Sequence, residues 1–145
     1  MLFIDAGNNK VGIGTDSPDK DLTVKGQIAV HTGSITVNNR VEFTGSFKSP
    51  SSVKTIIDTY STASCNMAKY TIHGIDNVST DREVAEVILY HSGSQAHVSR
   101  TFTDYTGNAS FMAFSGSVNG GHARLHVTCI NNSNTLTIMR NSLLA

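Results

Sequence analysis

The chain has 145 residues, and its eleven basic and eleven acidic side chains cancel to a formal net charge of zero. A nucleic-acid-binding protein or a polybasic membrane anchor needs a surplus of Lys and Arg, so this balance argues against both partners. Charged residues make up only 15% of the chain, and Ser, Thr, Asn and Gly take their place, as on sheets that pack against one another. The length suits one compact domain with a short extension.

The sequence indicates neither membrane insertion nor secretion. No run of about twenty apolar residues could span a bilayer, and the start, Met1 to Asp5, lacks the basic and apolar regions of a signal peptide. The two cysteines, Cys65 and Cys129, could form a disulfide, but a small secreted scaffold usually carries more, so buried thiols are favoured. We therefore expect a product of the cytoplasm that is later built into a larger particle.

Residues 1–48 are predicted to form very short strands separated by Gly and Asn turns. The expected strands are Leu2–Ile4, Val11–Ile13, Leu22–Val24, Gln27–Val30, Ile35–Val37 and Val41–Phe43. Strands with so few apolar residues cannot enclose a core within one chain, whereas three chains wound about a common axis would bury them. The candidates for a trimer interface are Val11, Ile13, Leu22, Val24, Ile28 and Val30.

Residues 49–145 are predicted to form longer strands, after a linker around Pro50. The expected strands are Ser52–Asp58, Ala68–Gly74, Glu83–His91, Gln95–Thr103, Ala109–Ser115, His122–Ile130 and Thr135–Arg140. Hairpin signals separate them at Ser92–Ser94, Thr106–Asn108, Asn119–Gly121 and Asn131–Asn134. This spacing predicts an all-β fold whose second part is an antiparallel β-sandwich, jelly-roll-like in its connections.

Two of these strands show which residues should form the core. In His122–Ile130 the apolar residues alternate with polar ones, so Ala123, Leu125, Val127 and Cys129 are expected inside. In Glu83–His91 both faces are apolar. A strand of that kind is either central in its sheet or covered by a neighbouring subunit.

A Gly-rich motif occupies residues 7–26. It runs Gly7-Asn8-Asn9-Lys10-Val11-Gly12-Ile13-Gly14-Thr15, then Ser17-Pro18, then Leu22-Thr23-Val24-Lys25-Gly26. This motif resembles a repeat in the shafts of phage tail fibres and related trimeric appendages. In such a shaft Gly12 and Gly14 would allow close backbone approach and Pro18 would fix a turn, while Val11, Ile13, Leu22 and Val24 would point inward.

A second similarity lies in the C-terminal half. The segments 68–72, 83–91 and 120–128 resemble a β-domain common in structural proteins of marine and cyanobacterial phages. Together the two resemblances imply a trimeric, virion-attached protein without catalytic activity or cofactor. The chain departs from long fibres because it has one clear copy of the shaft repeat, no obvious anchoring helix and no self-cleaving chaperone tail.

The sequence shows no convincing catalytic or metal site. The histidines form no His-x-His pair, and His122 and His126 lie too far apart along one strand face to share a metal. Asp16, Asp19 and Asp21 are favoured as a solvated turn, although carbonyl groups from a trimer partner could complete an ion site. Glu83 and Glu86 fall on opposite strand faces, so they cannot flank one glycosidic bond.

These observations predict a non-enzymatic virion structural protein of a tailed bacteriophage, assembled in the host cytoplasm. It would be a homotrimeric short fibre, whisker or capsid decoration that contacts other virion proteins of the capsid, neck or tail. The alternative is a receptor-binding fibre tip that recognises a host cell-surface glycan. For that alternative Tyr105, beside the Thr106–Asn108 turn, is the candidate glycan contact, because aromatic rings stack on sugars.

Overall fold

The computed structural model describes residues 1–26, 28, 35–37 and 41–144. Within these ranges the protein consists of strands and turns without a helix, so the all-β prediction is confirmed. Contacts divide the chain into two units, Met1–Gly33 and Ser34–Ala145. Each unit is described by itself below.

This division falls earlier in the chain than the expected boundary between residues 48 and 49. The cause is β5 (Val41–Lys48), which pairs antiparallel with β12 (Asn134–Leu144) from the other end of the chain. The short strand β4 (Ile35–Val37) pairs in turn with β5. The role of residues 1–48 as a shaft segment stays a prediction.

The first unit is a small sheet of three short strands, β1 (Leu2–Asp5), β2 (Lys10–Ile13) and β3 (Leu22–Val24). β1 and β2 form an antiparallel hairpin, and β3 runs parallel to β2. The hairpin turn is closed by Asp5, whose carboxylate accepts hydrogen bonds from the backbone and side chain of Asn8 at 3.1 and 2.8 Å. These bonds lower the pKa of Asp5 below its usual value.

Close packing of the backbone explains one of the motif glycines. A Cβ at Gly12 would meet the carbonyl oxygen of Thr15, so only glycine allows the chain to turn back at this point. Gly14 has a φ of 75°, in the left-handed region that glycine adopts readily. The sequence predicted that Gly12 and Gly14 allow close approach of the backbone. The structure gives both residues a reason to be glycine within a single chain.

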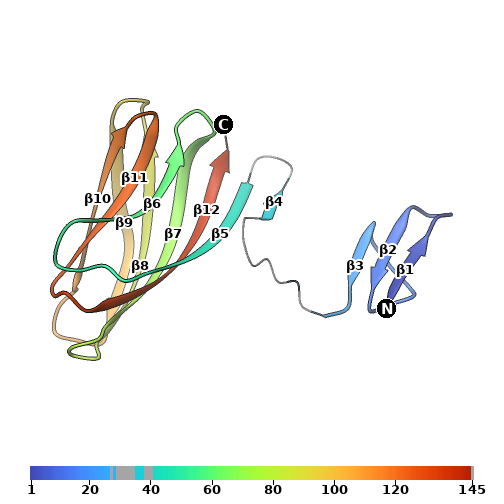
Figure 1. The fold of residues 1–145 in the computed structure, drawn as a ribbon, viewed down its shortest axis with the longest axis horizontal. Coiled ribbons are helices and arrows are strands. Elements are labelled where there is room, and N and C mark those ends of the chain that lie inside the picture. The colour runs from blue at the N-terminus through green and yellow to red at the C-terminus, as the bar shows by residue number, and fades with distance from the viewer. Residues whose placement is uncertain (27, 29–34, 38–40, 145) are drawn as a thin grey trace. The chain divides into compact units, whose positions relative to one another are not determined.

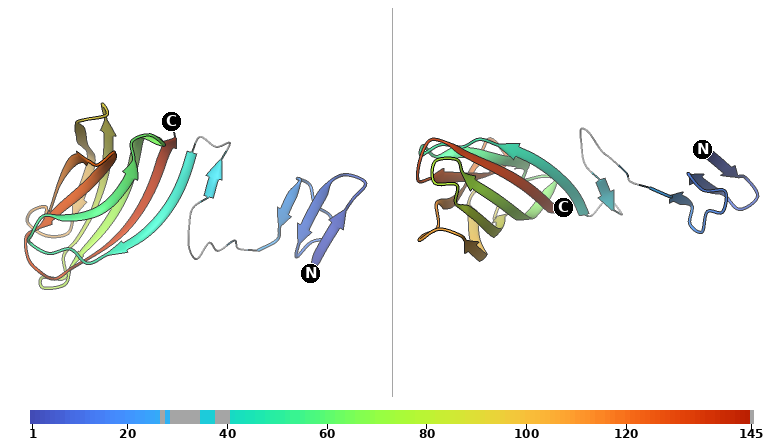
Figure 2. Two further views of the ribbon diagram at one scale, coloured as in Figure 1. Left: turned by 45° about the horizontal axis from the view of Figure 1, so that its top comes forward. Right: turned by 90° about the horizontal axis from the view of Figure 1, so that it is seen from below.

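The second unit is a β-sandwich, which confirms that part of the prediction. One sheet has the order β4-β5-β12-β7-β8-β9, and the other has the order β10-β11-β6. Figures 1 and 2 show the two sheets as two layers. The remaining strands are β6 (Thr55–Ser61), β7 (Cys65–Asp76), β8 (Arg82–His91), β9 (Ala96–Tyr105), β10 (Met112–Asn119) and β11 (His122–Cys129).

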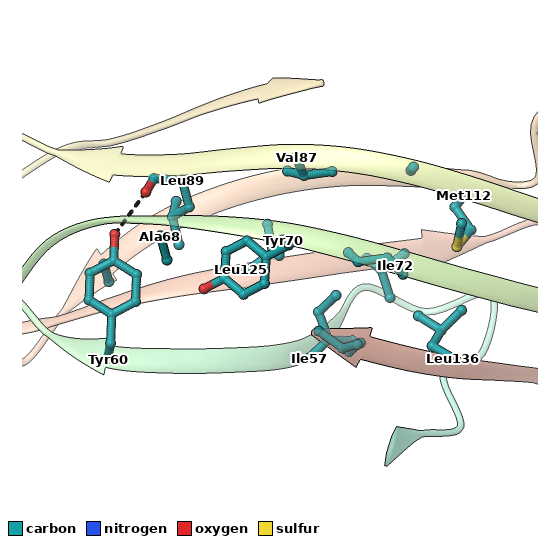
Figure 3. Close-up of a cluster of buried hydrophobic side chains, with 14 of the residues drawn as sticks. Ile57, Tyr60, Ala68, Tyr70, Ile72, Val87, Leu89, Met112, Leu125 and Leu136 are labelled. Atoms are coloured by element: carbon teal, nitrogen blue, oxygen red, sulfur yellow. Dashed lines mark hydrogen bonds between the residues drawn. The ribbon is translucent and has the colours of Figure 1, made fainter. Parts of the chain in front are cut away.

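The core lies between the two sheets and follows the expected alternation. Ala123, Leu125 and Val127 of β11 are fully buried and Cys129 nearly so. Both sheets contribute side chains, among them Ile57, Tyr60, Tyr70, Ile72, Val87, Leu89 and Leu136 (Figure 3). The hydroxyl of Tyr60 on β6 donates a hydrogen bond of 3.0 Å to the carbonyl of Leu89 on β8. This bond satisfies a buried polar group and joins the two layers.

A buried carboxylate fixes the entry into β10. Glu83 is 1% exposed, and its Oε2 accepts bonds from the backbone N–H groups of Phe111 and Met112 at 2.8 and 3.1 Å. Its Oε1 accepts from Ser110, Thr103 and Arg100 at 2.7, 3.1 and 3.1 Å. Five donors therefore compensate the charge that burial would otherwise penalise.

Candidate functional site

A pocket opens at one end of the larger sheet and encloses about 210 Å³. Its lining residues come from β7, β8, β9 and the turn after β9, and they are His73, Arg82, Val84, Asp104, Tyr105 and Thr106. The predicted glycan-contact residue, Tyr105, is among the lining residues, but it pairs with the buried Glu83, so alternation directs its side chain to the face opposite to Asp104. Its role as a glycan contact stays a prediction.

The strand register places the pocket on the outer face of the sheet. His73 pairs with Val84, and Val84 pairs with Asp104, so these three residues form a row across β7, β8 and β9. Each follows or precedes an inward residue, such as the fully buried Ile72 and Ala85, and side chains of a strand alternate between faces. The row therefore points away from the core.

The turn after β9 holds the side of the pocket in place. The backbone N–H of Arg82 donates to the hydroxyl of Thr106 at 2.9 Å. The backbone N–H of Thr106 donates in return to the carbonyl of Arg82 at 2.9 Å. This reciprocal pair fixes the start of β8 against the end of β9, so the pocket wall does not depend on one contact.

Several polar groups of the pocket have no hydrogen-bond partner among the described residues. They are the Arg82 guanidinium, the His73 imidazole and the Tyr105 hydroxyl. Oδ1 of Asp104 accepts the backbone N–H of Tyr105 at 2.9 Å, and no partner is recorded within the described ranges for Oδ2. A small hollow lined by a few polar groups is a common form of a small-ligand site.

An apolar surface lies on the same outer face, further along the strands. We call it the apolar sheet face and define it as Met67, Ile88, Tyr90, Phe102, Met139 and Leu143. Tyr90, Phe102, Met139 and Leu143 are 46–50% exposed, and the Tyr90 ring stacks on His97 with centroids 4.9 Å apart. The sequence predicted that a strand with two apolar faces is either central in its sheet or covered by a neighbouring subunit. In the structure β8 lies between β7 and β9 and also exposes one apolar face.

The trimer-interface candidates of the first unit lie on neighbouring strands. Val11 pairs with Leu22 and Ile13 pairs with Val24, across β2 and β3. Ile13, Leu22 and Ile28 are 45%, 56% and 66% exposed, while Val11 and Val24 are half-buried. Val30, the sixth candidate, lies outside the described residues.

The acidic turn is occupied by contacts within the chain. Asp16 accepts a bond from the Ser17 hydroxyl at 3.1 Å, and Asp19 accepts one from the Thr23 hydroxyl at 3.0 Å. In the part of the chain that the structure describes, no group of three or more His, Cys, Asp or Glu side chains could hold a metal ion. The same ranges contain no helix long and apolar enough to span a membrane.

His126 lies on the polar strand face of β11, yet it is buried. It is 8% exposed, and its Nε2 lies 2.8 Å from the Ser117 hydroxyl. Burial lowers the pKa of His126, and the nearby positive charges of Lys54 and Arg124 act in the same direction. This burial could not be predicted from the alternation in β11, because His126 alternates with core residues and belongs to the polar face.

The two cysteines are thiols, not a disulfide, and both are buried. Burial raises the pKa of Cys129 to about 11. A second hollow of about 410 Å³ lies beside Cys129, between β10 and β11 at the end near Ser110. Its polar Ser110 hydroxyl is already bonded to Glu83, so this hollow offers fewer open polar groups than the pocket at Tyr105.

No known family model matches the sequence, and no curated protein matches it significantly. Solved structures of phage tailspikes do show a likeness. The tailspike of Acinetobacter baumannii phage AM24 matches 72% of this chain at a TM-score of 0.44 and 12% identity. A tailspike of Acinetobacter baumannii bacteriophage Fri1, described as a capsular polysaccharide depolymerase, matches 83% at 0.42 and 13%. The tailspike of Acinetobacter phage vB_ApiP_P1 matches 83% at 0.36 and 16%.

The chain spans only about a quarter of each tailspike, namely 26%, 24% and 25% of their lengths. Likenesses at such TM-scores assign neither a family nor an activity to this chain. They do correct one expectation. The prediction that the chain is not an enzyme is contradicted by a structural neighbour described as a depolymerase. The reasoning failed because missing motifs in a sequence do not exclude chemistry whose residues meet only in the folded or assembled protein.

Proposed function

We propose that this chain is part of the virion of a tailed bacteriophage, a tail appendage that works as a homotrimer and contacts other virion proteins. The virion assignment rests on the resemblance of residues 7–26 to the shaft repeat. The trimer rests on one structural observation, the apolar side chains that the first unit leaves exposed. These are Leu2, Ile4, Ile13, Leu22 and Ile28, which are 45–66% exposed.

This exposure is costly for a monomer. Fully burying an aliphatic side chain contributes about 1.5–3 kcal/mol, so each of these half-exposed side chains forgoes roughly 1 kcal/mol in a single chain. In the described part of the first unit, only Gly12 and Pro18 are buried. The unit therefore has almost no core of its own, and other copies of the chain would supply one.

The apolar sheet face is a second surface that requires a partner. Its residues lie on four neighbouring strands, β12, β7, β8 and β9. At about 4.8 Å between strands and about 6.6 Å between the three rows of outward residues, the face measures about 380 Å². Two such faces would bury about 760 Å², less than a specific interface needs, so this face would add to the contacts made by the first unit.

Charge does not oppose contact between copies at this face. Its central charged residues, Lys69 and Glu86, form an ion pair of 2.9 Å. The pair is neutral as a whole, so an identical face can approach without net repulsion. We infer that the apolar sheet face is buried between copies in the trimer.

Light scattering behind a sizing column tests the proposal. We expect a mass of three protomers that persists on dilution, and a monomer would refute the trimer. Peroxide oxidation of the unmodified protein then locates the interface. Met1 and Met139 are 74% and 49% exposed in the single chain, whereas Met112 is 2% exposed. We expect Met139 to be protected like Met112, and oxidation of Met139 as fast as Met1 would refute burial of the face.

Recognition of a host cell-surface glycan is a second candidate function. The observation that favours it is the pocket around Tyr105, with its unpartnered polar groups. The pocket and the apolar sheet face lie in different rows of the outer face, so one chain could serve both assembly and recognition. Retention of the purified protein on immobilised bacterial surface polysaccharide tests this candidate, and no retention on polysaccharide from any permissive host would refute it.

A further inference from the structure

We propose that the outer face of the smaller sheet binds a doubly charged oxyanion, a sulfate or phosphate group, between Lys54 and Arg124. This inference goes beyond the proposed function and does not rest on it. It is argued from the strand register, the charge of the face, its hydroxyl groups and the position of His126. We call the site the basic face and define it as Lys54, Ser115, Ser117, Arg124, His126 and Thr128.

The register of the smaller sheet places Arg124 and His126 in successive outward positions of β11. Both residues alternate with the fully buried Ala123, Leu125 and Val127, so their side chains point away from the core. Outward positions of one strand are about 6.6 Å apart. Arg124 therefore lies next to His126 on the outer face.

Lys54 reaches the same face from the other side of His126. His126 pairs with Ile56 of β6, and Lys54 precedes Ile56 by two residues, directly before the strand begins. Alternation therefore directs Lys54 outward, and it is exposed. It lies level with Thr128, one outward position beyond His126, because Thr55 pairs with Val127. The two positive charges thus flank His126 in opposite directions along the strands.

The charge of the face selects an anion. The one acid in β6, β10 and β11 is Asp58. It faces the interior, where it accepts bonds from Tyr70 at 2.8 Å and from Arg140 at 3.0 Å, both on the larger sheet. Lys54 and Arg124 form no ion pair with another described residue. A singly charged anion would compensate only one of them, whereas a doubly charged oxyanion matches both.

Hydroxyl groups add neutral donors to the two cations. Ser115 pairs with His126, and Thr128 occupies the next outward position of β11. The hydroxyl of Ser117 lies 2.8 Å from Nε2 of His126. A sulfate or phosphate group presents several acceptor oxygens, so it can accept from a guanidinium, an ammonium and a hydroxyl together.

His126 reports on the space between the two cations. Burial lowers its pKa most, and the charges of Lys54 and Arg124 lower it further, so both charges act at this imidazole. His122 is the other titratable group of the outward positions, two further along β11, and β10 contributes none. A bound anion would oppose the two charges and raise the pKa of His126. By linkage, the anion should bind more tightly as the pH falls and His126 takes up a proton.

An NMR titration of the His126 imidazole in the full chain tests the inference. Sodium sulfate replaces sodium chloride at constant ionic strength, which keeps general screening the same. We expect sulfate to raise the pKa of His126 and to bind with a dissociation constant on the order of 10 mM. Lys54→Gln and Arg124→Gln should each weaken sulfate binding about tenfold, the loss of one charged hydrogen bond.

Lys48→Gln is the matched control. Lys48 is an exposed lysine of β5 in the larger sheet, and the substitution removes the same charge as Lys54→Gln. We expect this variant to bind sulfate like the wild type. Equal weakening in Lys48→Gln and Lys54→Gln would overturn the inference, because net charge alone would then explain binding. The same pKa of His126 in sulfate and in chloride would also overturn it.

Dextran sulfate and uncharged dextran identify the source of the oxyanion. Tighter binding of dextran sulfate than of inorganic sulfate, counted per sulfate group and weakened by Arg124→Gln, would support the site and assign it to an anionic polymer. Equal affinity, weakened in the same variant, would support the site and assign it to the free ion. Displacement of sulfate by uncharged dextran would overturn the inference, because the face would then not select for charge.

Discussion

Glu83 is the residue whose replacement should reveal most about what holds the sandwich together. Replacing it with glutamine keeps the size of the side chain and removes one of its two acceptor oxygens. The five donors around the carboxylate come from Arg100, Thr103 and the 110–112 segment. The amide nitrogen of glutamine is a hydrogen-bond donor, so wherever it points in this network it faces another donor. The backbone N–H groups of Phe111 and Met112 cannot rotate away from it.

The magnitude follows from the burial of this network. If the amide nitrogen occupies the Oε2 position, the N–H groups of Phe111 and Met112 lose their acceptor. Each unsatisfied buried group costs about 1–3 kcal/mol. If it occupies the Oε1 position, Arg100 loses its buried partner, and such a loss costs about 3–5 kcal/mol. We therefore expect Glu83→Gln to lower the free energy of unfolding by about 3–5 kcal/mol.

Urea unfolding at neutral pH and one protein concentration, followed by circular dichroism, measures this effect. Glu86→Gln is the control on the same strand. Glu86 pairs with Lys69 at 2.9 Å, but the two side chains are 35% and 44% exposed, so its loss should cost no more than about 1 kcal/mol. An effect of Glu83→Gln as small as that of Glu86→Gln would show that the buried network does not stabilise the fold.

Three further changes test the sandwich. Tyr70→Phe removes a 2.8 Å bond from the buried hydroxyl to Asp58, and should lower the free energy of unfolding by about 1.5–3 kcal/mol in the same urea assay. Gly116→Ala would place a Cβ 2.8 Å from a β9 side chain. It should cost about 1–3 kcal/mol in thermal melts, whereas Gly45→Ala, with nothing within 4 Å, should cost less. The folded-state pKa of His126 lies below the ordinary 6.5, so the unfolded state takes up the proton first. Stability should therefore fall as pH drops below about 6.5, and His126→Gln should reduce that fall.

The strands themselves could be predicted because their signals are local. In β11 the alternation of Ala123, Leu125 and Val127 with polar residues predicted the buried face, and all three are fully buried. The turns at 92–94 and 119–121 likewise separate strands where the Gly and Asn residues predicted them. Such signals need only neighbouring residues, which is why one sequence is sufficient to find them.

The pairing of distant strands could not be predicted in the same way. β5 was expected as a three-residue strand of the N-terminal segment, yet it spans Val41–Lys48 and pairs with β12. The alternation of side chains along β5 is compatible with pairing to any strand. The sequence therefore does not identify β12 as its partner. Long-range pairing depends on which edge strand is left open when the rest of the sheet has formed.

The candidate pocket shows the same limit. Tyr105 could be singled out because it lies beside a turn, but His73 and Arg82 carried no signal that links them to it. The three residues belong to different strands, and only the register of β7, β8 and β9 brings them to one end of the sheet.

By itself, the sequence determined the all-β class and the positions of the longer strands, and it predicted that residues 1–48 need apolar partners. Those properties follow from composition and from a period of two, which neighbouring residues decide. Only the tertiary structure decided that β5 joins the sandwich, that Glu83 is buried among five donors, and that a pocket forms around Tyr105. These features depend on residues far apart in the chain, and packing between the sheets is what brings them together.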